Sequence, residues 1–440
     1  MNSLFGTSGI RGPVDTLFTP QFCFDIGRSF ALHLDSQNQN GTIALGTDSR
    51  QSSPLISEYL TAGLQSADRE VTDLGVVPAP AVNYALVSGS FIASLMVTGS
   101  HIDITANGVK FFSHKEEIGK ADELAISEIY YAQKDSQAFF LPKNPATQSR
   151  IGFDNYVEFL LKIADKPLPR WKIIVDPGNG SQTEVIRTVL TQLDQEVIMI
   201  NADLQKTLIS RDTETEGAFD ELEKAVLDNH AGFGIGFDTD GDRLIFVDRF
   251  GKFVPGDYTG VLQAKWHSSN IIVSPVNSTS ILNSIGKEII RTKVGSPFVV
   301  EAMKKYGSQF GFESNGGGIN GDYMYTRDGG SSLLFLLNIL KWSGKPLDIL
   351  LAEFPKTFIL RDKFACAKEN YTKILSSATH FLTPHSIDTT DGVKLILDDQ
   401  TWVLFRPSSN APEFRIFVES NSATKANQLI TSAINFAKSL

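Results

Sequence analysis

The chain is poor in cysteine and has no excess of basic charge. Cys23 and Cys366 are its only cysteines among 440 residues, so they provide neither a disulfide framework nor a thiolate metal site. The formal net charge of −10 lacks the basic face that nucleic acids and anionic membranes require. These absences favour a reducing, cytoplasmic compartment and predict that neither nucleic acid nor a membrane is a partner.

Long apolar runs, a signal peptide and a nucleotide-binding loop are also missing. The longest apolar stretch, residues 333–340, is interrupted by Asn338 and is too short to span a bilayer. The first residues lack the basic and apolar regions of a signal peptide. Residues 176–181 (DPGNGS) lack the Gly-Lys-Ser/Thr ending of a nucleotide loop. We therefore expect a cytoplasmic protein without a nucleotide cofactor.

Three alternating aspartates are the first positive signal. Asp238, Asp240 and Asp242 follow an apolar segment, and in an extended conformation their carboxylates face the same way, as a hard cation such as Mg²⁺ requires. A calcium-binding hand is excluded, because Arg249 and Arg243 stand where it needs a glutamate and a glycine. The alternative is an acidic solvated turn. Three carboxylates packed between apolar strands would, however, repel one another unless a cation neutralised them. The pattern predicts a Mg²⁺ site.

A second segment places a serine where a strand turns into a loop. Thr98 and Gly99 follow the apolar residues 91–97, and Ser100 and His101 come next. An exposed hydroxyl with loop N–H groups around it can carry a phosphate, although a polar turn with a chance Ser-His pair is the alternative. Together with the aspartates, this segment predicts covalent phosphoryl chemistry on Ser100.

Five segments in the right order resemble the α-D-phosphohexomutase superfamily, in particular its bacterial phosphomannomutase/phosphoglucomutase branch. The segments are residues 5–12 (FGTSGIRG), 97–112 around Ser100, 238–243 (DTDGDR), 311–317 (GFESNGG) and 406–415 (RPSSNAPEFR). The resemblance covers essentially the whole chain.

The chain also departs from the commonest patterns of that superfamily. Gly99 stands for the usual alanine, Asn315 and Gly317 for serine and histidine, and Asn410 and Ala411 for threonine and glutamate. The departures leave the reaction class unchanged and leave the preferred hexose open.

Strands followed by turns and amphipathic stretches recur at residues 42–46, 172–175 and 271–274, which is typical of βαβ units. We expect three related α/β/α domains with mixed sheets and a smaller C-terminal α+β domain. Their expected bounds are residues 1–148 with the phosphoserine loop, 149–249 with the metal loop, 250–356 with the sugar-binding loop and 357–440 with the phosphate-binding loop. The resemblance implies that they surround a central cleft.

The resemblance implies a phosphohexomutase that interconverts the 1- and 6-phosphates of mannose or glucose. Ser100 would carry the phosphoryl group, and a hexose 1,6-bisphosphate would be the intermediate and activator. Mg²⁺ would be held by the phosphoserine with Asp238, Asp240 and Asp242. The partner would be a small-molecule hexose phosphate, and the protein a monomer or homodimer.

The same resemblance assigns roles to further residues. His101, Lys110 and Arg243 would be catalytic, with Lys110 the first choice and His101 the second for the proton shuttle. The residues expected to bind the substrate are Arg11, Lys293, Glu313 and Asn315. Those expected to hold its distal phosphate are Arg406, Ser408, Ser409, Asn410 and Arg415.

Two other functions stay open. A phosphatase of the haloacid-dehalogenase type would use Asp238 as its nucleophile, but Asp242 stands where such enzymes prefer threonine or valine. That function also leaves the loops of Ser100, Glu313 and Arg406 unexplained. A catalytically weak sugar-phosphate sensor accords with the unusual loops, whereas the retained serine and aspartates favour activity.

Overall fold

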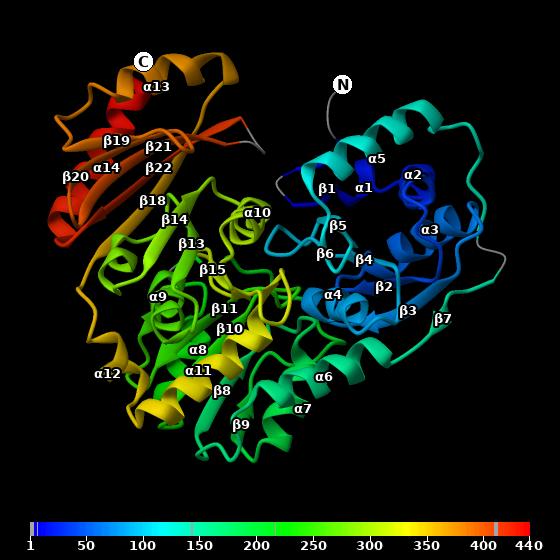
Figure 1. Ribbon diagram of the computed structural model, residues 1–440, viewed down its shortest axis with the longest axis horizontal. Helices are drawn as coiled ribbons and strands as arrows, with labels where there is room; N and C mark the ends of the chain where they lie inside the picture. The colour runs from blue at the N-terminus through cyan, green and yellow to red at the C-terminus, as the bar shows by residue number, and fades with distance from the viewer. Residues whose placement is uncertain (1–3, 7, 142–143, 216, 409–411) are drawn as a thin grey trace. The chain divides into compact units, whose positions relative to one another are not determined.

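The computed structural model describes residues 4–6, 8–141, 144–215, 217–408 and 412–440 (Figure 1). The chain divides into two compact units. The first comprises Met1–Gly256 and Asn315–Leu347, and the second Asp257–Ser314 and Asp348–Leu440. The domain bounds expected from the sequence stay a prediction, because these units are larger than the expected domains.

A mixed sheet begins the first unit, in the strand order β1-β5-β4-β2-β3-β7 with β6 added to β5. Its strands are β1 (Ile10–Pro13), β2 (Ile43–Thr47), β3 (Val71–Val76), β4 (Ala93–Val97), β5 (Ala106–Ser113), β6 (Glu116–Glu117) and β7 (Thr147–Gln148). Its helices are α1 (Val14–Leu17), α2 (Pro20–Ser36), α3 (Ser53–Gln65), α4 (Ala79–Val87) and α5 (Lys120–Gln133). β2 and β4 are buried at every position, which explains their continuous apolar runs.

Core packing in this sheet sets the direction of a candidate site residue. The Phe111 ring on β5 lies 5.3 Å from the ring of Phe5 and 5.2 Å from that of Phe30. Because neighbouring side chains of a strand point to opposite faces, burying Phe111 in this core directs Lys110 to the other face of the sheet.

A second sheet in the same unit has the order β12-β11-β10-β8-β9. Its strands are β8 (Lys172–Asp176), β9 (Glu196–Met199), β10 (Phe233–Phe237), β11 (Leu244–Asp248) and β12 (Phe253–Val254). Its helices are α6 (Ile151–Ile163), α7 (Thr183–Gln192) and α8 (Asp220–Asp228). The glycines of β10 serve packing: a Cβ on Gly236 would lie 2.4 Å from Phe219, and one on Gly234 2.7 Å from Val226 on α8.

The segment Asn315–Leu347 is held in this unit by a buried asparagine. It contains β16 (Gly318–Asn320), β17 (Arg327–Asp328) and α11 (Gly329–Ser343), and α11 lies beside α6 (Figure 1). Asn338 on α11 donates to the Ile163 carbonyl at 2.9 Å and accepts from the Asp165 N–H at 2.9 Å. These bonds satisfy backbone groups that the end of α6 leaves unpaired.

The second unit contains the parallel strands β13 (Ile271–Pro275), β14 (Glu288–Thr292) and β15 (Phe310–Phe312). The helical elements around them are α9 (Gly256–Trp266), η1 (Ser280–Ser284), α10 (Ser296–Tyr306) and α12 (Leu347–Leu351). An antiparallel sheet follows, in the order β18-β22-β21-β20-β19. Its elements are β18 (Phe358–Ala365), η2 (Lys368–Asn370), α13 (Tyr371–Ala378), β19 (Ser386–Asp388), β20 (Val393–Asp398), β21 (Thr401–Pro407), β22 (Glu413–Ser420) and α14 (Ala423–Lys438).

The strands expected at residues 42–46, 172–175 and 271–274 are β2, β8 and β13, so these predictions are confirmed. None of the helices in the described part of the chain is long and apolar enough to be a membrane-spanning segment.

The contact between α2 and α3 generates a stability prediction. A Cβ on Gly63 would lie 2.1 Å from the Phe24 carbonyl oxygen and 2.9 Å from the Arg28 nitrogen. These backbone atoms cannot rotate away, so Gly63→Ala should lower the free energy of unfolding by about 1 to 3 kcal/mol despite the better helix propensity of alanine. Gly119→Ala is the matched control, since its added Cβ meets nothing within 4 Å. Chemical denaturation measures both, and an unchanged midpoint for Gly63→Ala would contradict the packing argument.

Candidate active site

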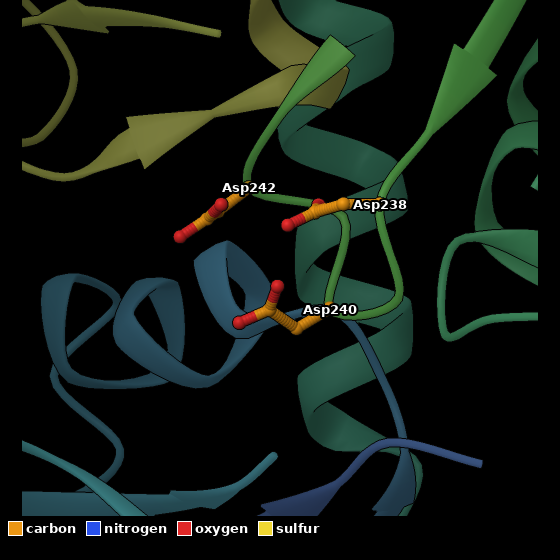
Figure 2. A group of neighbouring side chains, drawn as sticks. All are labelled: Asp238, Asp240 and Asp242. Atoms are coloured by element: carbon orange, nitrogen blue, oxygen red, sulfur yellow. The ribbon is translucent and has the colours of Figure 1, made fainter. Parts of the chain in front are cut away.

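Three aspartate carboxylates come together in the loop that joins β10 to β11. Asp238, Asp240 and Asp242 are buried, and one oxygen from each lies within 4.8 Å of the others. Figure 2 shows the three side chains projecting from this one loop. Oδ1 of Asp240 and Oδ1 of Asp242 are buried and accept no hydrogen bond from the described residues. Burial and the two neighbouring carboxylates hold the pKa of Asp238 well above its usual range.

Lysine and arginine offset part of this charge. Lys110 Nζ donates to Asp240 Oδ2 at 2.6 Å and to Asp242 Oδ2 at 2.7 Å, and Arg327 Nη2 donates to Asp242 Oδ2 at 2.8 Å. Although burial opposes ionisation, Arg327, Lys110 and Arg243 hold the pKa of Asp242 well below its usual range. Burial likewise opposes the charge on Lys110, but Asp240 and Asp242 raise its pKa, so the ammonium keeps its proton.

The donor set fits a divalent cation. It offers three convergent carboxylates, two of which keep a buried oxygen that accepts no hydrogen bond from the described part of the chain. Mg²⁺ prefers oxygen ligands of this kind. Asp238, Asp240 and Asp242 are therefore the residues that would hold it.

Ser100 lies against the same carboxylates. Its Oγ donates to Asp238 Oδ2 at 2.9 Å and lies 3.3 Å from His101 Nδ1. The serine has a φ of 52°, in the left-handed region that residues other than glycine seldom adopt. The sequence predicts an exposed hydroxyl, but Ser100 is fully buried, because the loop that carries the aspartates covers it. Here the prediction from the sequence was wrong.

Positive side chains surround the serine. The pKa of the His101 imidazole is lowered chiefly by Arg243, and further by burial, Arg11 and Arg327. The imidazole is therefore neutral. Nε of Arg11 and Nε of Arg243 are buried and donate no hydrogen bond within the described ranges. Guanidinium donors of this kind suit a phosphoryl group, which accepts several charge-assisted hydrogen bonds.

The loop that starts at Asn315 packs on the aspartate loop. The Asn315 carbonyl accepts a hydrogen bond from Thr213 Oγ1 at 2.6 Å, and Asn315 Oδ1 accepts one from Arg327 Nη1 at 3.3 Å. Gly317 has a φ of 77°, and a Cβ there would lie 2.2 Å from the Asp242 carbonyl oxygen. The close approach leaves no room for a side chain at this position.

Two arginines oppose each other in the antiparallel sheet of the second unit. Arg406 on β21 pairs directly with Arg415 on β22, and each is offset by a carboxylate because opposed like charges repel. Arg406 Nε donates to Asp391 Oδ2 at 2.6 Å, and Arg415 Nε and Nη2 donate to Glu413 Oε1 at 2.9 and 2.6 Å. Two guanidinium groups at one strand end suit a phosphate dianion.

The remaining predicted residues also follow strand ends. The Ser408 N–H donates to the Glu413 carbonyl at 3.0 Å, whereas Ser409 and Asn410 lie outside the described residues. Glu313 is buried directly after β15. Lys293 is exposed directly after β14, with its Nζ 5.9 Å from the centroid of a phenylalanine ring.

The predicted residues are divided between the two units. The group in the first unit comprises Arg11, Ser100, His101, Lys110, the three aspartates, Arg243 and Asn315. The second unit contains Lys293, Glu313, Arg406, Ser408 and Arg415. Sequence reasoning missed Arg327, whose only local signal is an Arg-Asp-Gly-Gly sequence before an apolar helix.

A buried serine thus lies beside three convergent carboxylates, on α/β domains that an antiparallel sheet follows along the chain. Residues 2–137, 154–251 and 255–358 match the models for alpha/beta/alpha domains I, II and III of phosphoglucomutase/phosphomannomutase. The chain belongs to this family, within the α-D-phosphohexomutase superfamily, and is an intramolecular phosphotransferase. The predicted fold class is confirmed.

Relatives cover essentially the whole chain. It is 30% identical to a phosphoglucomutase/phosphomannomutase of Thermococcus kodakarensis over 99% of this chain and 98% of that protein. It is 31% identical to a phosphoglucosamine mutase of Caldanaerobacter subterraneus over 98% and 97% of the two chains. A crystal structure of a family protein from Burkholderia thailandensis superposes with a TM-score of 0.84 at 23% identity, covering 100% and 98% of the chains, and supports the fold.

Asp328, next to Arg327, generates a pH prediction. Its Oδ1 accepts from the Tyr156 hydroxyl at 2.5 Å and from the Ser331 N–H at 3.0 Å, and its Oδ2 is buried and accepts no hydrogen bond from the described residues. Burial raises the pKa of Asp328 to about 6. A carboxyl group whose pKa is higher in the folded than in the unfolded chain stabilises the fold while it is protonated. This stabilisation is complete below the pKa of the unfolded chain, near 4, and is lost as the pH rises through the pKa of the folded chain.

Asp328→Asn removes this titration and keeps an oxygen that can accept both hydrogen bonds. The difference in unfolding free energy, Asp328→Asn minus wild type, should therefore rise by about 2 kcal/mol between about pH 4 and pH 7. Denaturant titrations of both proteins at each pH measure it. A difference that stays constant with pH would show that Asp328 is ionised as readily in the folded as in the unfolded chain.

Proposed function

We propose that the protein interconverts hexose 1-phosphate and hexose 6-phosphate through a phosphoserine at Ser100 and a hexose 1,6-bisphosphate intermediate. The observation that carries the proposal is the contact of Ser100 Oγ with Asp238 Oδ2 at 2.9 Å, within a buried cluster of three carboxylates. A lone buried serine needs no such cluster, whereas a transferring phosphoryl group needs charge offset at this point.

In the first transfer, the bond between phosphorus and Ser100 Oγ breaks as a bond forms between phosphorus and a free hydroxyl oxygen of the sugar phosphate. The bisphosphate then presents its other phosphate, and the reverse transfer restores the phosphoserine. Mg²⁺ bound by Asp238, Asp240 and Asp242 would offset negative charge on the transferring group. No phosphate is consumed over the cycle.

The sugar hydroxyl must lose a proton in the first transfer and regain one in the second. The pKa of Lys110 is raised by Asp240 and Asp242, so its ammonium is suited to stabilise charge and is a poor acceptor. His101 is neutral, and its Nδ1 lies 3.3 Å from Ser100 Oγ. We therefore assign the proton acceptor to His101, the second choice from the sequence, and charge stabilisation to Lys110, Arg11 and Arg243.

We propose that the residues predicted from the sequence recognise the substrate. Arg406, Ser408, Ser409 and Asn410 would hold the distal phosphate with support from Arg415. Glu313 would accept hydrogen bonds from two neighbouring sugar hydroxyls. Asn315 and Lys293 would complete the substrate contacts.

Glucose, mannose and glucosamine have the same configuration at C3 and C4 and differ at C2. A carboxylate that reads C3 and C4 would accept all three sugars, which agrees with relatives named phosphoglucomutase/phosphomannomutase and phosphoglucosamine mutase. We propose glucose and mannose phosphates as substrates, with glucosamine phosphate as the second candidate.

Ser100→Ala should lower mutase activity by at least about a thousandfold, because no other group replaces the nucleophile. Phosphate transfer from labelled glucose 1,6-bisphosphate should no longer label the protein. The matched control is Ser94→Ala, which removes another fully buried hydroxyl, one that donates to the Val82 carbonyl. Labelling of the control should persist and should fall when EDTA removes divalent cations. Full turnover by Ser100→Ala would refute the phosphoserine mechanism.

The sugar assignment predicts that glucose 1-phosphate and mannose 1-phosphate differ in kcat/KM by less than about tenfold. Galactose 1-phosphate should be about ten- to a hundredfold worse, because inversion at C4 removes a hydrogen bond to a charged acceptor worth about 1.5 to 3 kcal/mol. Coupled assays on these sugars and glucosamine 1-phosphate decide it. If glucosamine 1-phosphate exceeds both glucose and mannose by more than about a hundredfold, the enzyme reads C2 and the second candidate replaces the first.

A further inference from the structure

Arg50 lies in the turn that follows β2 and has no role in the function proposed above. Its side chain is almost fully buried, with 1% of its surface exposed. Nε donates to Asp48 Oδ2 at 3.1 Å, while Asp48 Oδ1 accepts from Ser53 Oγ at 2.6 Å and from the Arg50 N–H at 3.0 Å. The guanidinium group is therefore held at one edge by a carboxylate that is itself fixed.

The other edge of the guanidinium group faces the serine loop. Nη2 of Arg50 donates to the carbonyl oxygens of Ser100 at 2.6 Å and Ile102 at 2.9 Å, and Nη1 donates to that of Asp103 at 3.4 Å. One side chain thus gathers three carbonyl groups of the loop. None of these bonds involves the serine hydroxyl, which stays directed at Asp238.

The serine needs such support because its backbone is strained. A φ of 52° lies in the left-handed region, where a residue with a side chain persists only if its surroundings hold it there. The Ser100 N–H donates to Thr98 Oγ1 at 2.8 Å, and its carbonyl also accepts from Thr239 Oγ1 at 2.5 Å. Arg50 adds a charged donor to the same carbonyl.

Gly99 provides the space for this guanidinium group. A Cβ at Gly99 would lie 2.7 Å from Cζ, Nε and Nη2 of Arg50. The φ of Gly99 lies outside the left-handed region, so its backbone would accept alanine, the residue of the commoner pattern. The side chain of Arg50 cannot yield easily, because Asp48 and three carbonyls hold its end.

We propose that Arg50 is a positioning residue for phosphoryl transfer and that Gly99 is the position that admits it. Arg50 holds Ser100 in the left-handed conformation that aims Oγ at the aspartate loop. The inference rests on the proposed phosphoserine mechanism and adds to it a determinant that touches neither the substrate nor the reacting atoms.

The test measures the single-turnover rate of Ser100 phosphorylation by glucose 1,6-bisphosphate with saturating Mg²⁺, together with kcat, KM and Tm. Arg50→Gln should lower the phosphorylation rate and kcat by about a hundredfold, as a misplacement of about 1 Å does, and leave KM within about twofold. The phosphorylation rate and kcat of Arg50→Lys should lie between those of Arg50→Gln and wild type, because one ammonium group replaces only some of the N–H donors of the guanidinium group.

Gly99→Ala should also slow phosphorylation, although it removes no hydrogen-bonding group. In the double variant Gly99→Ala/Arg50→Gln, the added methyl group no longer meets a guanidinium group. The double variant should therefore be no slower than Arg50→Gln alone, which is the non-additivity expected of residues in contact. Gly119→Ala, whose Cβ meets nothing within 4 Å, controls for the added methyl group.

Arg69→Gln is the matched control for the loss of a buried arginine. Arg69 is 7% exposed, pairs with Asp35 and donates to the Gln39 carbonyl at 2.9 Å, away from the serine loop. This variant should lower Tm and leave the phosphorylation rate of the folded protein unchanged.

The outcomes separate the inference from the function on which it rests. If wild-type protein takes no phosphate on Ser100, the proposed function fails. If wild type is phosphorylated and Arg50→Gln matches it, or slows only as Arg69→Gln does, the positioning role is overturned. Should Arg50→Gln not fold, Gly99→Ala alone decides, and its phosphorylation at the wild-type rate would also overturn the inference.

Discussion

Repulsion among three buried carboxylates is the constraint on which the rest of the site depends. Asp238, Asp240 and Asp242 lose solvation together in one loop, and neighbouring like charges in a medium of low dielectric are unfavourable unless cations offset them. Lys110 and Arg327 donate to two of these carboxylates. The cluster thereby explains the dense positive charge around the serine and supports the Mg²⁺ site proposed above.

Close backbone packing brings the parts of this site into contact. The loop after Asn315 approaches the aspartate loop so closely that Gly317 has room for no side chain. The serine loop closes around the Arg50 guanidinium group, where Gly99 leaves the necessary space. At both positions glycine makes room for the close approach of the loops.

Charge balance also supports the separate roles proposed for His101 and Lys110. The carboxylates keep the Lys110 ammonium charged, and the arginines keep the His101 imidazole neutral. A neutral imidazole thus lies 3.3 Å from the buried hydroxyl, and a permanent cation lies on the neighbouring carboxylates. Opposite shifts in two neighbouring groups are the usual basis for assigning separate roles in acid–base chemistry.

The amino-acid sequence by itself determined the α/β class and the strands β2, β8 and β13, because apolar runs are local properties. It also predicted that the aspartates converge, but they do so in a turn in which Gly241 has a φ of 68°, and not through the alternation of an extended strand. It could not reveal Arg50 or Arg327 as parts of the site, since each acts on a loop far away in the chain. It also predicted an exposed serine. Only the tertiary structure decided that Ser100 is buried, because the covering loop comes from another sheet, and burial depends on contacts that no local pattern encodes.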